Sequence, residues 1–301
     1  MKKQPAWRRA PEVGTAWGLR FIVFLLRTFG RAAASAFLWF VCLYYALTHP
    51  GRRLASRNYL ARVGQPTTLR AVIAHFWFFA RTSMDRYLFL TERIDEFEVH
   101  QHGHDNIVTA LENGKGKGAL LIGSHVGSFE AMRAVARRSA VPLTVVVDWR
   151  TAQRMNAVLA EVSPNLNVRL IGLDSADATS MLAVKACIDR GELVAMLADR
   201  LPERDDRSVK VDFLGGQARF PSGPFLLAHL LNCPVYLVFA LFTEPNRYDV
   251  HCELFADAIR LPRATREESV RAYAQKYASR IEHYVREAPQ NWFNFYDFWS
   301  D

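Results

Sequence analysis

The stretch Gly118-Ala-Leu-Leu-Ile-Gly-Ser-His125-Val-Gly-Ser-Phe-Glu130 decides the fold expected for this chain of 301 residues. Its apolar run, Ala119 to Ile122, is short, continuous and bounded by glycines, which is typical of a strand buried on both faces. Apolar residues then recur at helical spacing from Phe129 to Ser139, after two residues that suit a helix start. His125 is therefore expected in the loop between a central strand and a helix, where α/β proteins usually bind ligands.

Glu130 follows His125 by five residues, which on one straight helix would put the two side chains about 140° apart. If the helix starts near Gly127, however, Glu130 lies in its first turn and can reach back to a ring nitrogen of His125. A carboxylate bonded there fixes the tautomer and leaves the other nitrogen to accept a proton from a hydroxyl. The residues alone leave a second interpretation open, in which Glu130 complements the helix dipole and His125 is structural.

Strand-like apolar runs alternate with helical patterns along the rest of the chain. The expected strands are Ala119 to Ile122, Leu143 to Val147, Val168 to Ile171, Leu193 to Leu197, Val235 to Phe242 and Asp249 to Leu254. The expected helices cover about Arg52 to Arg62, Thr67 to Thr91, Phe129 to Ser139, Ala152 to Val162, Asp174 to Arg190, Gly223 to Leu231 and Arg266 to Arg286. This alternation predicts an α/β fold with a mostly parallel central sheet flanked by helices, and a hairpin of the last two strands at one edge.

Polar residues follow three of the expected strands at what should be one edge of the sheet. His125 comes after the first, Arg150 after the second, and Asp199 with Arg200 after the fourth. A guanidinium close to a basic histidine stabilises the oxyanion of a carbonyl under attack or binds a phosphate. An ion-pair network that holds the loops together is the alternative.

Positive charge is concentrated at the N-terminal end. Residues 1–70 hold twelve Lys or Arg and one acid, a net charge of +11, so the rest of the chain carries 26 basic minus 29 acidic residues, or −3, of the total of +8. A nucleic-acid-binding protein usually spreads its positive charge over the folded domain. Here the charge surrounds an apolar segment, which argues against nucleic acid and favours an anionic phospholipid surface as the partner.

The apolar segment runs from Thr15 to Thr48, and His49-Pro50-Gly51 predicts a sharp helix stop. One helix of this length would measure about 50 Å, more than the hydrocarbon core of a bilayer. Arg20, Arg27 and Arg31 would share one face, so we expect an amphipathic helix that follows the membrane surface or enters it at a slant. Spanning the membrane, lying in its plane and burial in a protein core all stay open.

We expect two parts, a membrane anchor over residues 1–50 and a catalytic domain over residues 51–301. The four cysteines show no paired spacing, which fits reduced thiols and a catalytic part at the cytoplasmic face. Three alternating histidines, His100, His102 and His104, would share a strand face, but Gly103 interrupts that strand. No metal site is therefore expected there.

The segment from His125 to Glu130 resembles the His-x4-Asp/Glu motif of the lysophospholipid acyltransferase superfamily, in the His-x-Gly-x-x-Glu variant of bacterial lipid A biosynthesis acyltransferases. Similar pieces occur in order over nearly the whole chain: Glu112-Asn-Gly-Lys-Gly-Lys-Gly-Ala-Leu-Leu-Ile122, Trp149-Arg150, Leu197-Ala-Asp199-Arg200, Val211-Asp-Phe-Leu-Gly-Gly216, Pro221-Ser-Gly-Pro-Phe-Leu-Leu-Ala228 and Ile281-Glu-His-Tyr-Val-Arg-Glu-Ala-Pro-Gln-Asn-Trp292. Enzymes that act on lipid A precursors usually carry an aromatic residue and Asn-Trp where this chain has Val126 and Ser128-Phe129. The acceptor therefore stays open between a lipid A precursor, another glycolipid, an ornithine lipid and an aryl polyene lipid.

The resemblance implies a glycerolipid acyltransferase-like fold and a membrane-associated O-acyltransferase at the cytoplasmic face of a bacterial inner membrane. His125 would be the base and Glu130 its partner, with Arg150 and Asp199 at the family's arginine and aspartate near the active site. The acyl chain would pass from an acyl-carrier-protein or coenzyme A thioester to a hydroxyl of a membrane lipid, without a cofactor.

A long apolar pocket is needed for the acyl chain, and Phe76, Phe79, Phe225 and Leu227 are the candidates to line it. Two other functions stay open at this point. One is a non-catalytic lipid-binding or scaffold protein on the same fold, and the other is a thioester hydrolase in which water replaces the acceptor.

Overall fold

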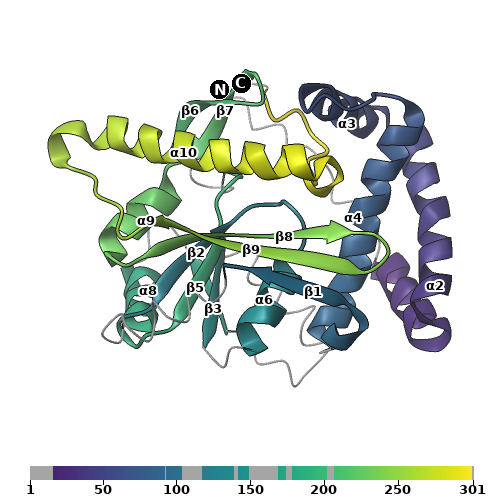
Figure 1. Cartoon of the computed structure of the whole chain (residues 1–301), viewed down its shortest axis with the longest axis horizontal. Coiled ribbons are helices and arrows are strands. Elements are labelled where there is room, and N and C mark those ends of the chain that lie inside the picture. Colours follow the sequence, from purple (N-terminus) through teal and green to yellow (C-terminus); the bar gives the residue numbers. More distant parts are fainter. Residues whose placement is uncertain are drawn as a thin grey trace.

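The apolar runs form a seven-stranded sheet with helices on both faces (Figure 1). The computed structural model describes residues 16–91, 93–103, 117–138, 142–148, 169–173, 178–201 and 207–299. The strands lie in the order β1 (Glu98–His102), β9 (Arg247–Ala256), β8 (Val235–Thr243), β2 (Ala119–Gly123), β5 (Leu193–Leu197), β3 (Leu143–Asp148) and β4 (Arg169–Leu173). Only β8 and β9 pair in antiparallel fashion within this described sheet, which confirms the mostly parallel α/β fold.

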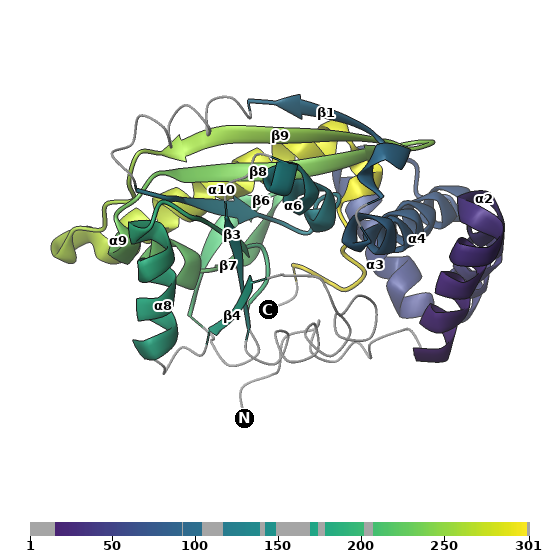
Figure 2. The ribbon, with the colours of Figure 1, turned by 90° about the horizontal axis from the view of Figure 1, so that it is seen from below.

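The strand β2 is central, as predicted, and every one of its residues is buried. Successive side chains of a strand point to opposite faces, so Leu120 and Ile122 join one apolar cluster, while Ala119 and Leu121 join another. The first cluster lies under α8 (Ala178–Asp189), α9 (Gly223–Leu231) and α10 (Arg266–Glu287), and the second under α4 (Leu69–Leu90) and α6 (Phe129–Arg138). Figure 2 looks onto the sheet, with α6 in front of the strands and α10 behind them.

The structure differs from the sequence prediction at the sheet edge. The β8–β9 hairpin forms, but β1 pairs in parallel with β9 and occupies the edge outside it. A second hairpin of β6 (Ser208–Phe213) and β7 (Gly216–Pro221) packs beside α10 and was not predicted as strands. The expected helix over 152–162 lies outside the described residues.

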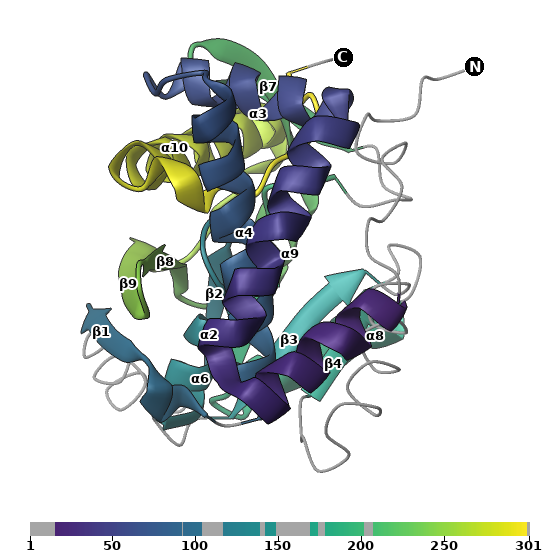
Figure 3. The same cartoon turned by 90° about the vertical axis from the view of Figure 1, so that its right-hand side faces the viewer.

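The N-terminal apolar segment forms α2 (Ala16–Thr48), which ends at the predicted stop, and α3 (Pro50–Arg62) begins within that stop after the single residue His49. The prediction of a single straight helix was wrong, because Gly30 has φ 79° and ψ −178° and bends the helix sharply (Figure 3). That backbone conformation is open essentially only to glycine. On the second half of α2, Ala34 and Leu38 recur four residues apart and pack with Met84 of α4.

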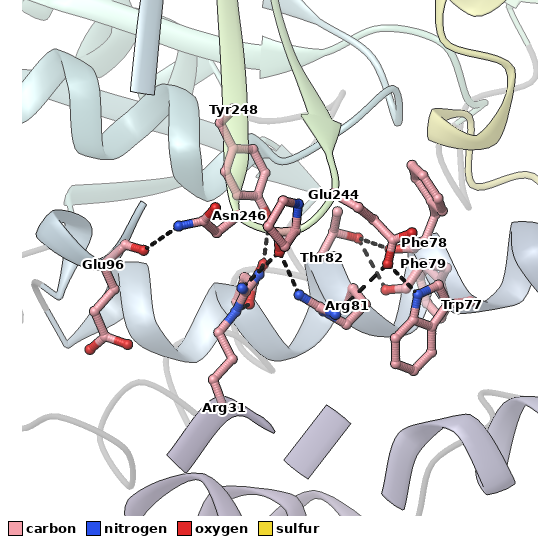
Figure 4. A network of polar contacts seen from close by, with 12 residues as sticks. Arg31, Trp77, Phe78, Phe79, Arg81, Thr82, Glu96, Glu244, Asn246 and Tyr248 are labelled. Carbon is pink, nitrogen blue, oxygen red and sulfur yellow. Dashed lines mark hydrogen bonds and ion pairs between the residues drawn. The ribbon is translucent and has the colours of Figure 1, made fainter. Parts of the chain in front are cut away.

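The bend turns Arg31 away from the face expected for it. Its guanidinium forms two bonds of 2.8 and 2.7 Å to Asp85 of α4, whose side chain is fully buried and also accepts the hydroxyl hydrogen of Tyr248. Arg31 and Arg81 both donate to the carbonyl of Pro245 in the β8–β9 turn (Figure 4). An ion network therefore fastens α2 to α4 and to the hairpin.

The outer side of α2 and the start of α3 carry exposed apolar side chains: Phe21, Phe24, Phe29, Trp39, Phe40, Tyr44, Leu47 and Leu54. The 29 residues from Arg20 to Thr48 are long and apolar enough to cross a membrane by length and composition, and little of this segment is buried in the protein. The boundary predicted at residue 50 stays a prediction.

Candidate active site

The register of two parallel strands brings His125 and Asp199 together. Gly123 at the end of β2 pairs with Leu197 at the end of β5, and His125 and Asp199 each follow two residues later. The amide of Ala198 donates to the carbonyl of Gly123 at 3.1 Å, which extends the pairing one step beyond the strands. The carboxyl ends of the two central strands thus deliver an imidazole and a carboxylate to one point, as the sequence predicted.

Both oxygens of the Asp199 carboxylate bind His125. Oδ1 lies 2.8 Å from ring Nδ1, and Oδ2 accepts the backbone N–H of His125 at 3.0 Å. A carboxylate only accepts hydrogen bonds, so Nδ1 carries the hydrogen and Nε2 is the unprotonated nitrogen. The side chain of Asp199 is 1 % exposed and that of His125 is 32 % exposed, which leaves the imidazole within reach of a substrate.

The charges around the pair keep the imidazole neutral and the carboxylate ionised. Burial lowers the pKa of His125 below its usual 6.5, and the guanidiniums of Arg200 and Arg86 lower it further, while Asp199 acts in the opposite direction. Burial alone would raise the pKa of the Asp199 carboxyl. The His125 imidazole and the Arg200 guanidinium outweigh that effect and hold this pKa at about 2. The arrangement is that of a general base with an orienting carboxylate.

The backbone of the His125 loop is held from two sides. Gly127 has φ +70°, and a Cβ at this position would overlap the carbonyl oxygen of Ala240 in β8. The N–H of Gly127 donates to the carbonyl of Asn291, and the N–H of Phe293 donates to the carbonyl of His125. A glycine is therefore required at 127, and hydrogen bonds from the C-terminal segment hold the backbone of His125 in position.

A buried polar chain in turn positions that C-terminal segment. His75 of α4 is fully buried, which lowers its pKa to about 4, so the ring is neutral. Its Nε2 donates to the carbonyl of Trp292 at 2.8 Å, and its Nδ1 accepts the hydroxyl hydrogen of Ser56 at 2.8 Å. Trp292 forms a bridge with Val126, next to the histidine. Helices α3 and α4 are thereby linked to the His125 loop.

Glu130 does not contact the ring as the sequence suggested. It lies in the first turn of α6, as expected, but its carboxylate faces α4, where Oε1 forms an ion pair of 2.6 Å with Nε of Arg86. The position at Nδ1 of His125 is taken by Asp199. The correction has a simple cause, since β5 lies directly beside β2 and carries its carboxylate to the ring, whereas α6 turns Glu130 toward α4.

Two arginines flank the histidine. Arg200, predicted at the site, donates to the carbonyl of Phe293 at 2.8 Å and stacks over Tyr296. Arg86 was missed, and the available signal was the pair Asp85-Arg86 between the apolar residues Met84 and Tyr87. Arg150, the other arginine predicted at the site, lies outside the described residues.

Three of the four candidates for an acyl pocket, Phe76, Phe225 and Leu227, are buried in the core. Phe79 is 44 % exposed, and it packs with Phe76 on Phe295 of the C-terminal segment. None of the four lines the small cavity that lies between the sheet and α6. That cavity is lined by Leu121, Gly123, Phe129, Met132, Arg133, Leu143, Ala195 and Val238.

The sequence also led to expectations for the thiols of the four cysteines and for the alternating histidines. All four cysteines are free and buried, in agreement with unpaired thiols. His102 stacks on His251 and pairs with Asp249, and His104 lies outside the described residues.

Residues 1–300 match the family described as bacterial lipid A biosynthesis acyltransferase. The chain belongs to this family. Comparison with curated proteins gives no match. The family indicates an acyltransferase of lipid A biosynthesis, and together with the apolar α2 it indicates association with a membrane.

Proposed function

We propose that this acyltransferase moves a fatty acyl chain from an acyl-carrier-protein or coenzyme A thioester to a hydroxyl of a membrane lipid, with His125 as the general base. The observation that carries the proposal is the bond between Nδ1 of His125 and the buried carboxylate of Asp199. It leaves Nε2 unprotonated on a partly exposed ring. That pairing has the geometry by which a carboxylate orients a catalytic histidine.

In the proposed reaction, Nε2 of His125 takes the proton of the acceptor hydroxyl as its oxygen attacks the thioester carbonyl carbon. The resulting imidazolium is stabilised by the Asp199 carboxylate across Nδ1. Collapse of the tetrahedral intermediate breaks the carbon–sulfur bond, and the departing thiolate takes the proton back from Nε2. The products are an ester and a free thiol, and no acyl-enzyme is formed.

The surroundings of the base support a lipid acceptor. The exposed aromatic residues of α2 suit a membrane surface, and α2 packs on α4, the helix that carries His75 and Arg86. We place the catalytic part at the cytoplasmic face of a bacterial inner membrane, where acyl thioesters are made.

The test is thioester turnover by the purified full-length protein in lipid micelles, for the wild type and for His125→Gln, with and without lipid acceptor. A general base contributes about 10²- to 10⁴-fold, so the variant should lose at least about 100-fold in the rate of acylated-lipid formation. Equal rates for the two proteins would remove His125 from the mechanism. Release of free fatty acid in place of acylated lipid would identify a thioester hydrolase, and lipid binding without turnover a scaffold protein.

A further inference from the structure

Arg86 has a place at the active site that the base reaction does not use. It projects from α4, its side chain is 49 % exposed, and its Nε forms an ion pair of 2.6 Å with Glu130. A guanidinium carries five N–H donors in a planar fork, so the pairing with Glu130 leaves four donors on a half-exposed side chain.

The neighbourhood of Arg86 is amphipathic. Phe79, Ser83 and Arg86 are exposed at positions i, i+4 and i+7 of α4, which places them on one helical face. The face extends about 10 Å, at 1.5 Å per residue. At its apolar end, Phe79 packs on Phe293 and Phe295 of the segment that holds His125. At its cationic end, Arg86 is close enough to His125 to lower the pKa of the imidazole.

We propose that Arg86 binds a phosphate group of a substrate and that Glu130 positions it for this task. The proposal rests on the proposed function, since it names a ligand of the same site. Arg200 supplies a second guanidinium on the flank of His125. A planar guanidinium held by a carboxylate on one edge offers its other edge to two phosphate oxygens.

The exposure of Arg86 argues for a substrate phosphate rather than for the oxyanion of the reacting carbonyl. Donors that stabilise an oxyanion act in dry, low-dielectric sites, whereas half of the Arg86 side chain is open to solvent. The Glu130 side chain is only 10 % exposed and is paired with Arg86, so its role in this proposal is to hold the arginine in place. The phosphate belongs to the acceptor head group or to the pantetheine-linked phosphates of the donor, and these sources are separable by experiment.

The experiment measures kcat and KM for Arg86→Ala, Arg86→Lys and Glu130→Gln, with Arg93→Ala as the control. Arg93 is a matched residue, since it is 45 % exposed and paired with Glu96, away from the histidine. On the donor side, lauroyl-coenzyme A is compared with lauroyl-pantetheine, which has the same thioester and no phosphate. On the acceptor side, a phosphorylated glucosamine lipid is compared with the same lipid after phosphatase treatment.

Arg86→Ala should raise KM about 10- to 100-fold, as expected for loss of a charged hydrogen bond, for whichever phosphate-bearing substrate it binds. The KM of the phosphate-free counterpart and kcat should stay within threefold. Arg86→Lys should recover part of the loss, and Glu130→Gln should raise KM in the same direction but add nothing once Arg86 is alanine. The acid limb of the pH–rate profile should also move to higher pH in Arg86→Ala, because a cation near His125 is gone.

Titration of the full-length protein with inorganic pyrophosphate gives a readout that needs no turnover. Wild type and Arg93→Ala should bind it equally, and Arg86→Ala at least tenfold more weakly. An unchanged KM for both phosphate-bearing substrates, or a fall in kcat alone, would overturn the proposal, and so would equal pyrophosphate binding by wild type and Arg86→Ala. If His125→Gln is fully active, the base assignment fails while the pyrophosphate result still decides the role of Arg86.

Discussion

Replacing Asp199 with asparagine tests which carboxylate orients the base. The backbone N–H of His125 points at one oxygen of Asp199, and a buried N–H needs an acceptor. In the variant, the amide oxygen must therefore take that position, and the amide NH2 group then faces Nδ1. Nδ1 becomes the acceptor, the hydrogen moves to Nε2, and the imidazole can no longer take a proton from the acceptor hydroxyl.

The magnitude follows from the bonds that the productive tautomer would lose. Keeping the hydrogen on Nδ1 leaves two buried donors without acceptors, at about 1–3 kcal/mol each. The sum of about 2–6 kcal/mol corresponds to a loss in kcat of roughly 30-fold to 10⁴-fold. KM should change little, because the asparagine has nearly the shape of the aspartate.

The assay is thioester turnover at saturating donor and acceptor, together with the thermal unfolding midpoint as a check of folding. Glu130→Gln is the comparison, since its loss should appear in KM and not in kcat. A folded Asp199→Asn protein with kcat within threefold of the wild type would refute the orienting role. A large fall in kcat for Glu130→Gln alone would give that role to Glu130.

Three other outcomes are expected. The rate should fall as the pH drops through the pKa of His125, because protonation removes the base. Since this pKa is lowered, the midpoint of the acid limb of kcat/KM should lie below 6.5. A midpoint above 7 would contradict the lowered pKa. Gly127→Ala should abolish activity and lower the unfolding temperature, because the new Cβ overlaps the carbonyl of Ala240; circular dichroism of the purified variant measures the second effect. Arg31→Met leaves the fully buried Asp85 without its main partner. The variant should lose about 3–5 kcal/mol of unfolding free energy, measured by denaturant titration. A loss under 1 kcal/mol would contradict a stabilising role of the ion network.

The sequence predicted the elements whose signals are local. A continuous apolar run between glycines identified β2, and the alternation that follows it identified the parallel sheet. The positions of His125 and Asp199 at neighbouring strand ends were also predictable, because parallel strands present their carboxyl ends at one edge.

The carboxylate partner of the histidine was not predictable from spacing alone. From the sequence alone, either Glu130 or Asp199 could contact the His125 ring. The strand order decides that it is Asp199, since β5 lies beside β2. Arg86 was missed for the same reason, because the contact between α4 and α6 is a tertiary one. The bend at Gly30 was missed because a lone glycine in an apolar helix has no distinct pattern until its φ is known.

The histidine loop depends on residues that are synthesised long after it. Phe293, whose N–H holds the carbonyl of His125, leaves the ribosome 168 residues after His125 (293 − 125). At about 5–20 residues per second, this is a delay of roughly 8–34 s. During that time α2 has already emerged and is free to meet a membrane, while the base has no fixed position. On the proposed function, α2 can therefore reach a membrane before the active site is assembled, and a chain that ends before Asn291 would keep α2 but lack the two hydrogen bonds that hold the His125 loop.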